Sequence, residues 1–177
     1  MDPKEALVVG EVAVLIFILI GGFINEFFNF TLFIAFEALF IALFFLILWK
    51  MKSVFGKGFI RYLLYFLILF CIILASLLLL VMSEKLAPRF DVFLVLVIAV
   101  IITNVAFRVI FGKKELQGKV LLSDNKLAVV ELPFDLFAGI PKGKYVVETD
   151  AKIAKGKKVK VKIKQMLFRR IPERVVK

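Results

Sequence analysis

Four long apolar stretches, separated by short polar segments, occupy the first part of the chain. The apolar stretches cover about 6–24, 30–49, 62–82 and 92–111. The polar segments between them are 25–29, 50–61 and 83–91. Because a membrane-spanning helix needs ~20 predominantly apolar residues, this pattern predicts four transmembrane helices.

The hydrophobic period changes after residue 112. Short strands are expected at 118–122, 127–132, 144–148, 157–164 and 165–171, with Pro172 ending the last one. Valine and isoleucine alternate with lysine in the fourth segment, which is the period of a half-buried strand. Four or five short strands in about 60 residues are typical of a small barrel or sandwich of OB or SH3 type. The predicted fold is an α-helical membrane domain, 1–112, followed by an all-β domain, 113–177.

Basic residues are unevenly placed along the chain. Residues 113–177 hold 17 Lys+Arg and 7 Asp+Glu, against 8 and 7 in the first 112 residues, so the β domain is basic. Segment 50–61 holds four basic residues, whereas 25–29 holds none and 83–91 two. Since short basic loops stay on the cytoplasmic side, we expect a multi-pass protein of the cell membrane with both termini in the cytoplasm. Trp49, Tyr62 and Tyr65 are expected at the inner membrane boundary.

The N-terminal apolar stretch is interpreted as a transmembrane helix rather than a signal peptide. Its preceding region has little net charge, because Lys4 is offset by Asp2 and Glu5. Its apolar run is long and lacks a small-residue cleavage site.

The composition excludes several classes of chemistry. The chain has no histidine and one cysteine, Cys71, so histidine catalysis, histidine metal ligands and an intrachain disulfide are excluded. It has no glycine-rich phosphate loop and no cysteine pair for a metal. We therefore predict no catalytic residues, no metal and no cofactor. One cysteine, two glutamines and many lysines are also typical of thermophilic, including archaeal, proteins.

Glu37 lies seven positions into the second apolar stretch, where a charged side chain costs roughly 2.5–3.5 kcal/mol. It is either a functional ionisable group or a protonated carboxyl in an interhelical hydrogen bond, for which Ser76 lies at matching depth. The face shared with Glu37 carries phenylalanine and the opposite face alanine: Phe33, Phe40 and Phe44 against Ala35, Ala38 and Ala42. Small faces favour close helix packing. If the alanines contact a neighbour within the chain, Glu37 faces elsewhere, for instance another subunit of a homo-oligomer.

Glu11 and Arg108 form a second polar group near the predicted cytoplasmic ends of the first and fourth helices. Asn104 lies one turn deeper than Arg108 on the same face. An ion pair between Glu11 and Arg108 would offset the desolvation cost of each. Alternatively, Arg108 extends to the lipid headgroups and Glu11 lies near the interface.

The basic strand near the C-terminus is a candidate surface for anions. Its lysines are Lys155, Lys157, Lys158, Lys160, Lys162 and Lys164. This face either is solvated and discourages edge pairing, or binds the anionic leaflet, or binds an acidic protein. Nucleic acid is disfavoured, because Tyr145 and Phe168 are the only aromatic residues nearby.

Two segments of the tail carry a resemblance to a known family. They are ELQGKVLLSDNKLAVVEL, 115–132, and IAKGKKVKVKIKQ, 153–165. In the second, Ile153, Gly156, Val159 and Val161 follow the pattern hydrophobic-x-x-Gly-x-x-Val-x-Val. Together with the preceding helices, they resemble short NfeD-type membrane proteins over about 60 residues. The family's early Gly-x-x-Gly pattern is missing, because leucine occupies position 121, where the second glycine after Gly118 would stand.

The resemblance implies an OB-type domain and membrane partners of the stomatin kind. Uncharacterised archaeal four-span membrane proteins with a basic β tail are equally similar. We predict a non-enzymatic membrane adaptor or scaffold, whose basic domain binds a membrane-associated protein or the anionic lipid surface. The alternative is a component of a small transporter or channel that uses Glu37 and Glu11.

Overall fold

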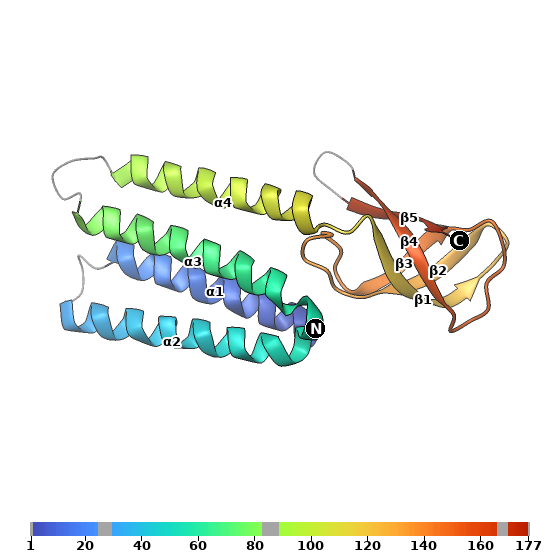
Figure 1. The fold of residues 1–177 in the computed structure, drawn as a ribbon, viewed down its shortest axis with the longest axis horizontal. Coiled ribbons are helices and arrows are strands. Elements are labelled where there is room, and N and C mark those ends of the chain that lie inside the picture. The colour runs from blue at the N-terminus through green and yellow to red at the C-terminus, as the bar shows by residue number, and fades with distance from the viewer. Residues whose placement is uncertain (1, 25–29, 83–88, 166–169, 177) are drawn as a thin grey trace. The chain divides into compact units, whose positions relative to one another are not determined.

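The computed structural model describes residues 2–24, 30–82, 89–165 and 170–176. The chain divides into two compact units, Pro3–Ala106 and Phe107–Lys177. The first is helical, and the second contains five strands (Figure 1). The expected polar break 25–29 and residues 83–88 of the expected turn lie outside the described residues.

The described residues form four α-helices, one for each apolar stretch of the sequence. They are α1 (Pro3–Ile24), α2 (Phe30–Phe55), α3 (Phe59–Met82) and α4 (Arg89–Phe111). Two stretches of the described chain are long and apolar enough to cross a membrane. One is Thr31–Leu79, with 49 residues from α2 and α3, and the other is Asp91–Phe111, with 21 residues. By length and composition, the described chain therefore supports two candidate membrane spans, not the four expected.

The prediction of a loop at 50–61 is wrong, because α2 continues to Phe55. Met51 is completely buried, so the apolar face of the helix continues past the point where lysines suggested its end. The lysines on either side of Met51 are exposed, as expected on the outer face of a helix. Gly56, with φ +51°, adopts a left-handed conformation that favours glycine. The 3₁₀ turn η2 (Gly56–Gly58) alone separates α2 from α3.

Aromatic contacts join α2 and α3 as an antiparallel pair. The rings of Phe44 and Phe70 stack with centroids 4.5 Å apart, and Phe55 packs on Tyr62 at 4.2 Å. Tyr62 and Tyr65 are buried, whereas Trp49 is 80% exposed. The two tyrosines therefore pack inside the helical unit. Only Trp49 has the exposed placement expected of a ring at a membrane boundary.

The five strands form a closed barrel. They are β1 (Glu115–Ser123), β2 (Leu127–Leu132), β3 (Gly143–Glu148), β4 (Lys158–Gln165) and β5 (Arg170–Val176). Their order is β1-β2-β3-β5-β4, with β1 pairing to β4, and β3 and β5 run parallel while the other pairs are antiparallel. The alternative of a sandwich is therefore excluded. The barrel closes between β3 and β5 through one described residue pair, Glu148 with Arg174.

The prediction that Pro172 ends the last strand is wrong. β5 passes through it to Val176, and residues 166–169 of the expected strand lie outside the described residues. Pro172 lies opposite Ile163, beside a register shift between Lys162 and Ile163. Proline is tolerated at such an irregularity because the missing N–H is not required by the ladder.

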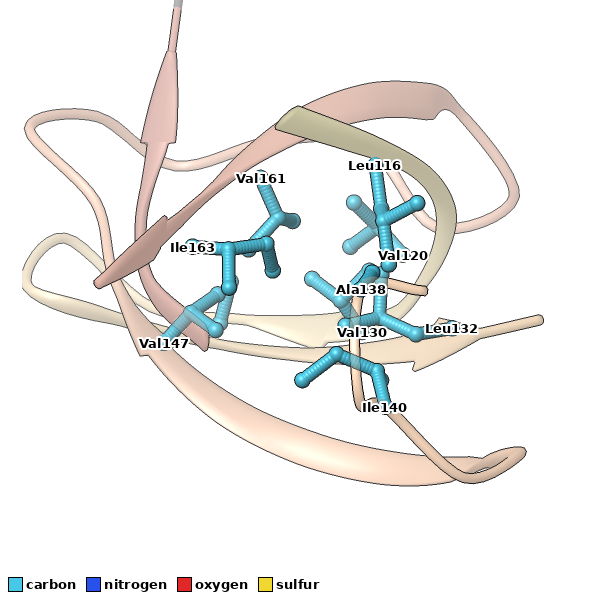
Figure 2. Close-up of a cluster of buried hydrophobic side chains, with 10 residues drawn as sticks. Leu116, Val120, Val130, Leu132, Ala138, Ile140, Val147, Val161 and Ile163 are labelled. Carbon is cyan, nitrogen blue, oxygen red and sulfur yellow. The ribbon is translucent and has the colours of Figure 1, made fainter. Parts of the chain in front are cut away.

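The barrel interior is filled by aliphatic side chains from β1 to β4 and from the connection between β2 and β3 (Figure 2). They are Leu116, Val120, Ala128, Val130, Leu132, Ala138, Ile140, Val147, Val161 and Ile163. Gly118 lies among them on β1. A Cβ atom there would collide with Val130 Cγ1 and lie 2.7 Å from Leu132 Cδ2 and 2.9 Å from the Glu131 carbonyl oxygen. Glycine at this position therefore permits β1 and β2 to approach.

A buried aspartate fixes the connection between β2 and β3. Asp135 is 3% exposed, and its Oδ1 accepts hydrogen bonds from the backbone N–H groups of Phe137 (3.1 Å) and Ala138 (3.0 Å). The backbones of Asp135 and Ile140 also pair with each other. The connection is therefore held by its own polar groups and closes one end of the core.

Candidate functional site

Glu11 is a fully buried carboxyl residue of the helical unit. It lies on α1 and is 0% exposed. Among the described residues, neither of its carboxyl oxygens has a hydrogen-bond partner. Arg108 is an exposed residue of the second unit, so its predicted ion pair with Glu11 stays a prediction.

Glu37 packs against α1. Gly21 of α1 is buried, and a Cβ atom there would collide with Glu37 Oε1 and lie 2.9 Å from Phe36 Cε1. Sequence reasoning missed this contact, although a glycine within an apolar helix is a signal of close approach. The carboxyl oxygens of Glu37 are buried and have no hydrogen-bond partner among the residues with described positions. This face of α2 thus meets a neighbour within the chain.

The alanine face of α2 is directed outward. Ala35, Ala38 and Ala42 are all exposed. The expectation that Glu37 faces another subunit required these alanines to pack against a neighbour within the chain. They do not, so this condition is not met.

The remaining intramembrane polar residues find partners in the helices. Ser76 is buried and donates a 2.9 Å hydrogen bond to the carbonyl of Ile72 in its own helix, so this bond satisfies its hydroxyl group within α3. Asn104 of α4 accepts a 2.7 Å hydrogen bond from the hydroxyl group of Tyr65 on α3. The sequence analysis did not predict this hydrogen bond between Tyr65 and Asn104.

The two buried carboxyls do not form one site. Glu37 lies beside Gly21, which is ten residues after Glu11 on α1. Ten residues of α-helix rise roughly 15 Å along the axis. Two carboxylates at that separation cannot share a proton or a metal ion. Within the described chain, no group of three or more metal-ligating side chains is found.

The lysines of the barrel alternate with core residues, as predicted. Lys158, Lys160, Lys162 and Lys164 of β4 are exposed, whereas Val161 and Ile163 between them are buried. Lys155 and Lys157 precede the strand and are also exposed. Lys164 pairs with Glu173 at 3.1 Å, and Lys160 lies 3.9 Å from Glu115. The acidic residues on neighbouring strands therefore compensate part of this face.

A second feature of the barrel, which sequence reasoning missed, is an outward apolar strip across β1, β2 and β3. Leu122 is opposite Val129, and Val129 is opposite Val146. Directly opposite residues share a face of the sheet. Leu122 is 68% exposed and Val146 64%, and Leu127, two residues before Val129, is 51% exposed. These four residues form the apolar strip.

Charged residues border the apolar strip. On one side, Lys119, Glu131 and Lys144 occupy opposite positions on the three strands. On the other side, Glu148 is opposite Leu127. An apolar centre with a charged rim is the usual anatomy of a protein-binding surface.

The period of β2 places Leu127 on the outer face, so the sequence carried a signal for this residue. The period of β1 would place Leu122 inward with Leu116 and Val120, and it is the register shift between Val120 and Leu122 that turns it outward.

Comparison with known proteins places the whole chain in one family. Neither the curated proteins nor the solved structures contain a match to it. The resemblance to NfeD-type proteins remains a prediction, with which a helical region followed by a β-barrel is consistent. Residues 2–176 match a family described as "Predicted membrane protein (DUF2101)". Because the match covers nearly all 177 residues, the chain belongs to this family of predicted membrane proteins.

Proposed function

We propose that the protein is a membrane-anchored adaptor whose barrel binds a membrane-associated protein through the apolar strip. The observation that carries this proposal is the row of Leu122, Val129 and Val146 across three strands, with Leu127 beside it. Burying such a row stabilises a complex by roughly 25 cal/mol for each Å² of apolar surface removed from water. None of the four side chains is aromatic, which disfavours single-stranded nucleic acid, because that ligand requires stacking.

In this proposal, all four helices cross the membrane. Each has 22 to 26 residues, which is enough for a bilayer core of ~30 Å. The 49-residue apolar stretch contains two antiparallel helices, so it supplies two crossings. Three lysines at the end of α2 and before α3 (Lys50, Lys52 and Lys57), with Lys113 and Lys114 after α4, support termini on the cytoplasmic side.

The barrel then works close to the membrane surface. Only Gly112, Lys113 and Lys114 separate the end of α4 from the start of β1. A three-residue link spans about 10 Å when fully extended. A partner that is itself bound to the membrane meets the barrel at high effective concentration. The order β1-β2-β3-β5-β4 is that of an OB-type barrel, a fold whose second and third strands form a common ligand face.

Site-specific photocrosslinking of the full chain in native membranes tests the adaptor role. A photoreactive residue at position 146 should give one discrete crosslinked protein. The same residue at Lys155, which is exposed outside the strip, should not. Leu122→Asp in the same chain should abolish the product from position 146, because it places a charge in the apolar centre. Equal products from positions 146 and 155, or none at 146, would refute the proposal.

A cysteine-accessibility experiment tests the topology. With Cys71 replaced by serine, cysteines at Lys57 and Lys126 should react with a membrane-impermeant reagent in inside-out vesicles only. Reaction of either position in right-side-out vesicles would contradict cytoplasmic termini.

A second candidate function, a small transporter or channel component, is favoured by the two buried carboxyls without hydrogen-bond partners. Glu11 and Glu37 both meet this description. An ionisable residue inside a membrane is a functional candidate by default. In proteoliposomes, Glu37→Gln should abolish proton or cation flux if Glu37 is in the path. An adaptor should give no flux, either as the unchanged protein or as the Glu37→Gln variant.

A further inference from the structure

A cavity of about 510 Å³ lies on the barrel, and none of its lining residues belongs to the apolar strip. Its walls come from the connection between β3 and β4, the first residues of β4 and the last residues of β5. The volume falls within the range of about 300–1,000 Å³ typical of small-molecule sites. The cavity is not part of the surface proposed to bind a partner protein, so it is a separate candidate site.

Lysines dominate the charge of the cavity. Lys152 and Lys157 come from the connection, Lys158 and Lys160 come from β4, and Asp150 is the single carboxylate in the lining. Among the described residues, Lys152, Lys157 and Lys158 make no ion pair. The pairs found in this region involve Lys160 and Lys164. The described lining therefore holds four lysines against one carboxylate, an excess of positive charge.

The wall of the cavity beneath these lysines is apolar. Ile153, Val159 and Val175 line it, and all three pack against the core of the barrel. Their positions are therefore set by the packing of the interior. The described lining contains no aromatic side chain, so the cavity has no platform on which a base could stack.

The connection that carries Lys152 and Lys157 is held in place before any ligand binds. The N–H of Gly156 donates to the carbonyl of Val120 at 2.7 Å. The N–H of Ile153 donates to Ser123 Oγ at 3.2 Å. Gly156 has φ +87°, which allows the chain to turn there without strain. A site whose backbone is already ordered loses less conformational entropy when it binds a ligand.

We propose that this cavity binds a phosphorylated ligand, with the phosphate among the lysines and an apolar or neutral body against the Ile153–Val159–Val175 wall. Lysine ammonium groups act as point charges for phosphate. A ligand with two or more negative charges matches the excess of lysine over carboxylate in the described lining. The volume exceeds that of a phosphate alone, which leaves room for the body of the ligand. A phospholipid headgroup and a free phosphorylated compound share this chemistry.

The test uses the full chain in nanodiscs of zwitterionic lipid, titrated at low salt with inorganic pyrophosphate and, separately, with short-chain phosphatidic acid. Lys157→Gln together with Lys158→Gln should weaken binding at least tenfold. Lys162→Gln together with Lys164→Gln also removes two positive charges, from the part of β4 outside the cavity. Because these two residues do not line the cavity, this control should change the affinity less than twofold. All four side chains are exposed, so both variants keep the core intact.

The relative affinities of the two probes identify the source of the phosphate. Tighter binding of phosphatidic acid assigns the cavity to a lipid headgroup, because only this probe has an acyl part for the apolar wall. Equal or tighter binding of pyrophosphate assigns it to a free compound. The proposal is overturned if neither probe binds at millimolar concentration. Equal losses in the two double variants would also overturn it, since they would indicate general attraction to a basic surface.

Discussion

Gly118→Ala should destabilise the barrel because it adds one methyl group where side chains and backbone of β2 leave no room for it. Carbon atoms in contact normally lie 3.5–4.0 Å apart. The new Cβ would be 2.7 Å from Leu132 Cδ2 and would also collide with Val130 Cγ1. Both side chains are completely buried, so they have no free space to move into. The third neighbour, the carbonyl oxygen of Glu131 at 2.9 Å, belongs to the backbone and moves only with the strand.

Overpacking of this kind costs typically 1–3 kcal/mol. A domain of this size has a free energy of unfolding near the lower end of the usual 5–15 kcal/mol. The variant should therefore still fold, but its barrel should open roughly 5-fold to 150-fold more often, at tenfold for each 1.4 kcal/mol. Hydrogen–deuterium exchange of the full chain in micelles measures this opening. Peptides from β1 and β2 should exchange faster, while peptides from α1 to α3 should not change.

Gly143→Ala is the matched control in the same barrel. A Cβ atom at Gly143 would lie 3.4–3.7 Å from ring atoms of Tyr145, which is ordinary contact. This variant should change exchange little. If the two alanine variants exchange alike, the close approach at Gly118 does not limit the packing of β1 on β2.

Three further predictions concern polar groups inside the two units. Asp135→Ala should lower the free energy of unfolding of the barrel by about 2–4 kcal/mol, because two backbone N–H groups lose a charged acceptor, and Asp135→Asn should cost less; chemical denaturation measures both. Tyr65→Phe and Asn104→Leu should show a coupling of about 0.6–1.7 kcal/mol in a double-mutant cycle, and a coupling of zero would mean that their hydrogen bond contributes nothing. Glu11→Leu should stabilise the helical unit in thermal unfolding, because it removes a buried carboxyl without a partner, and a lower melting temperature would indicate a structural role for the carboxyl.

The strands of the barrel were largely predictable from the sequence. Inward and outward positions alternate strictly in β4, where Val161 and Ile163 are buried and the lysines beside them exposed. That period identifies a strand and its core face without reference to any partner. The closed order of the five strands was not predictable, because it depends on pairings between strands far apart in the chain, such as β3 with β5.

The helical unit was less predictable, for two physical reasons. Lys50 and Lys52 suggested a loop, yet lysines on the exposed face of a helix leave its buried face, here Met51, undisturbed. The hydrogen bond between Tyr65 and Asn104 joins residues 39 positions apart on different helices. Apolar residues surround each helix, so the periodicity does not show which face meets which neighbour. The same ambiguity hid the contact between Glu37 and Gly21.

In the barrel, the residues that stabilise the fold lie inside, whereas the residues available for binding lie on the outside. Its buried core is aliphatic, and a change there alters packing before it alters recognition. Its outward positions differ from one side to another, with the apolar strip on β1, β2 and β3 and the lysine-lined cavity at β4 and β5. The closed ladder does not require leucine at position 122 or lysine at position 158. A charge placed in the strip and a charge removed from the cavity therefore test two separate binding events on one unchanged scaffold.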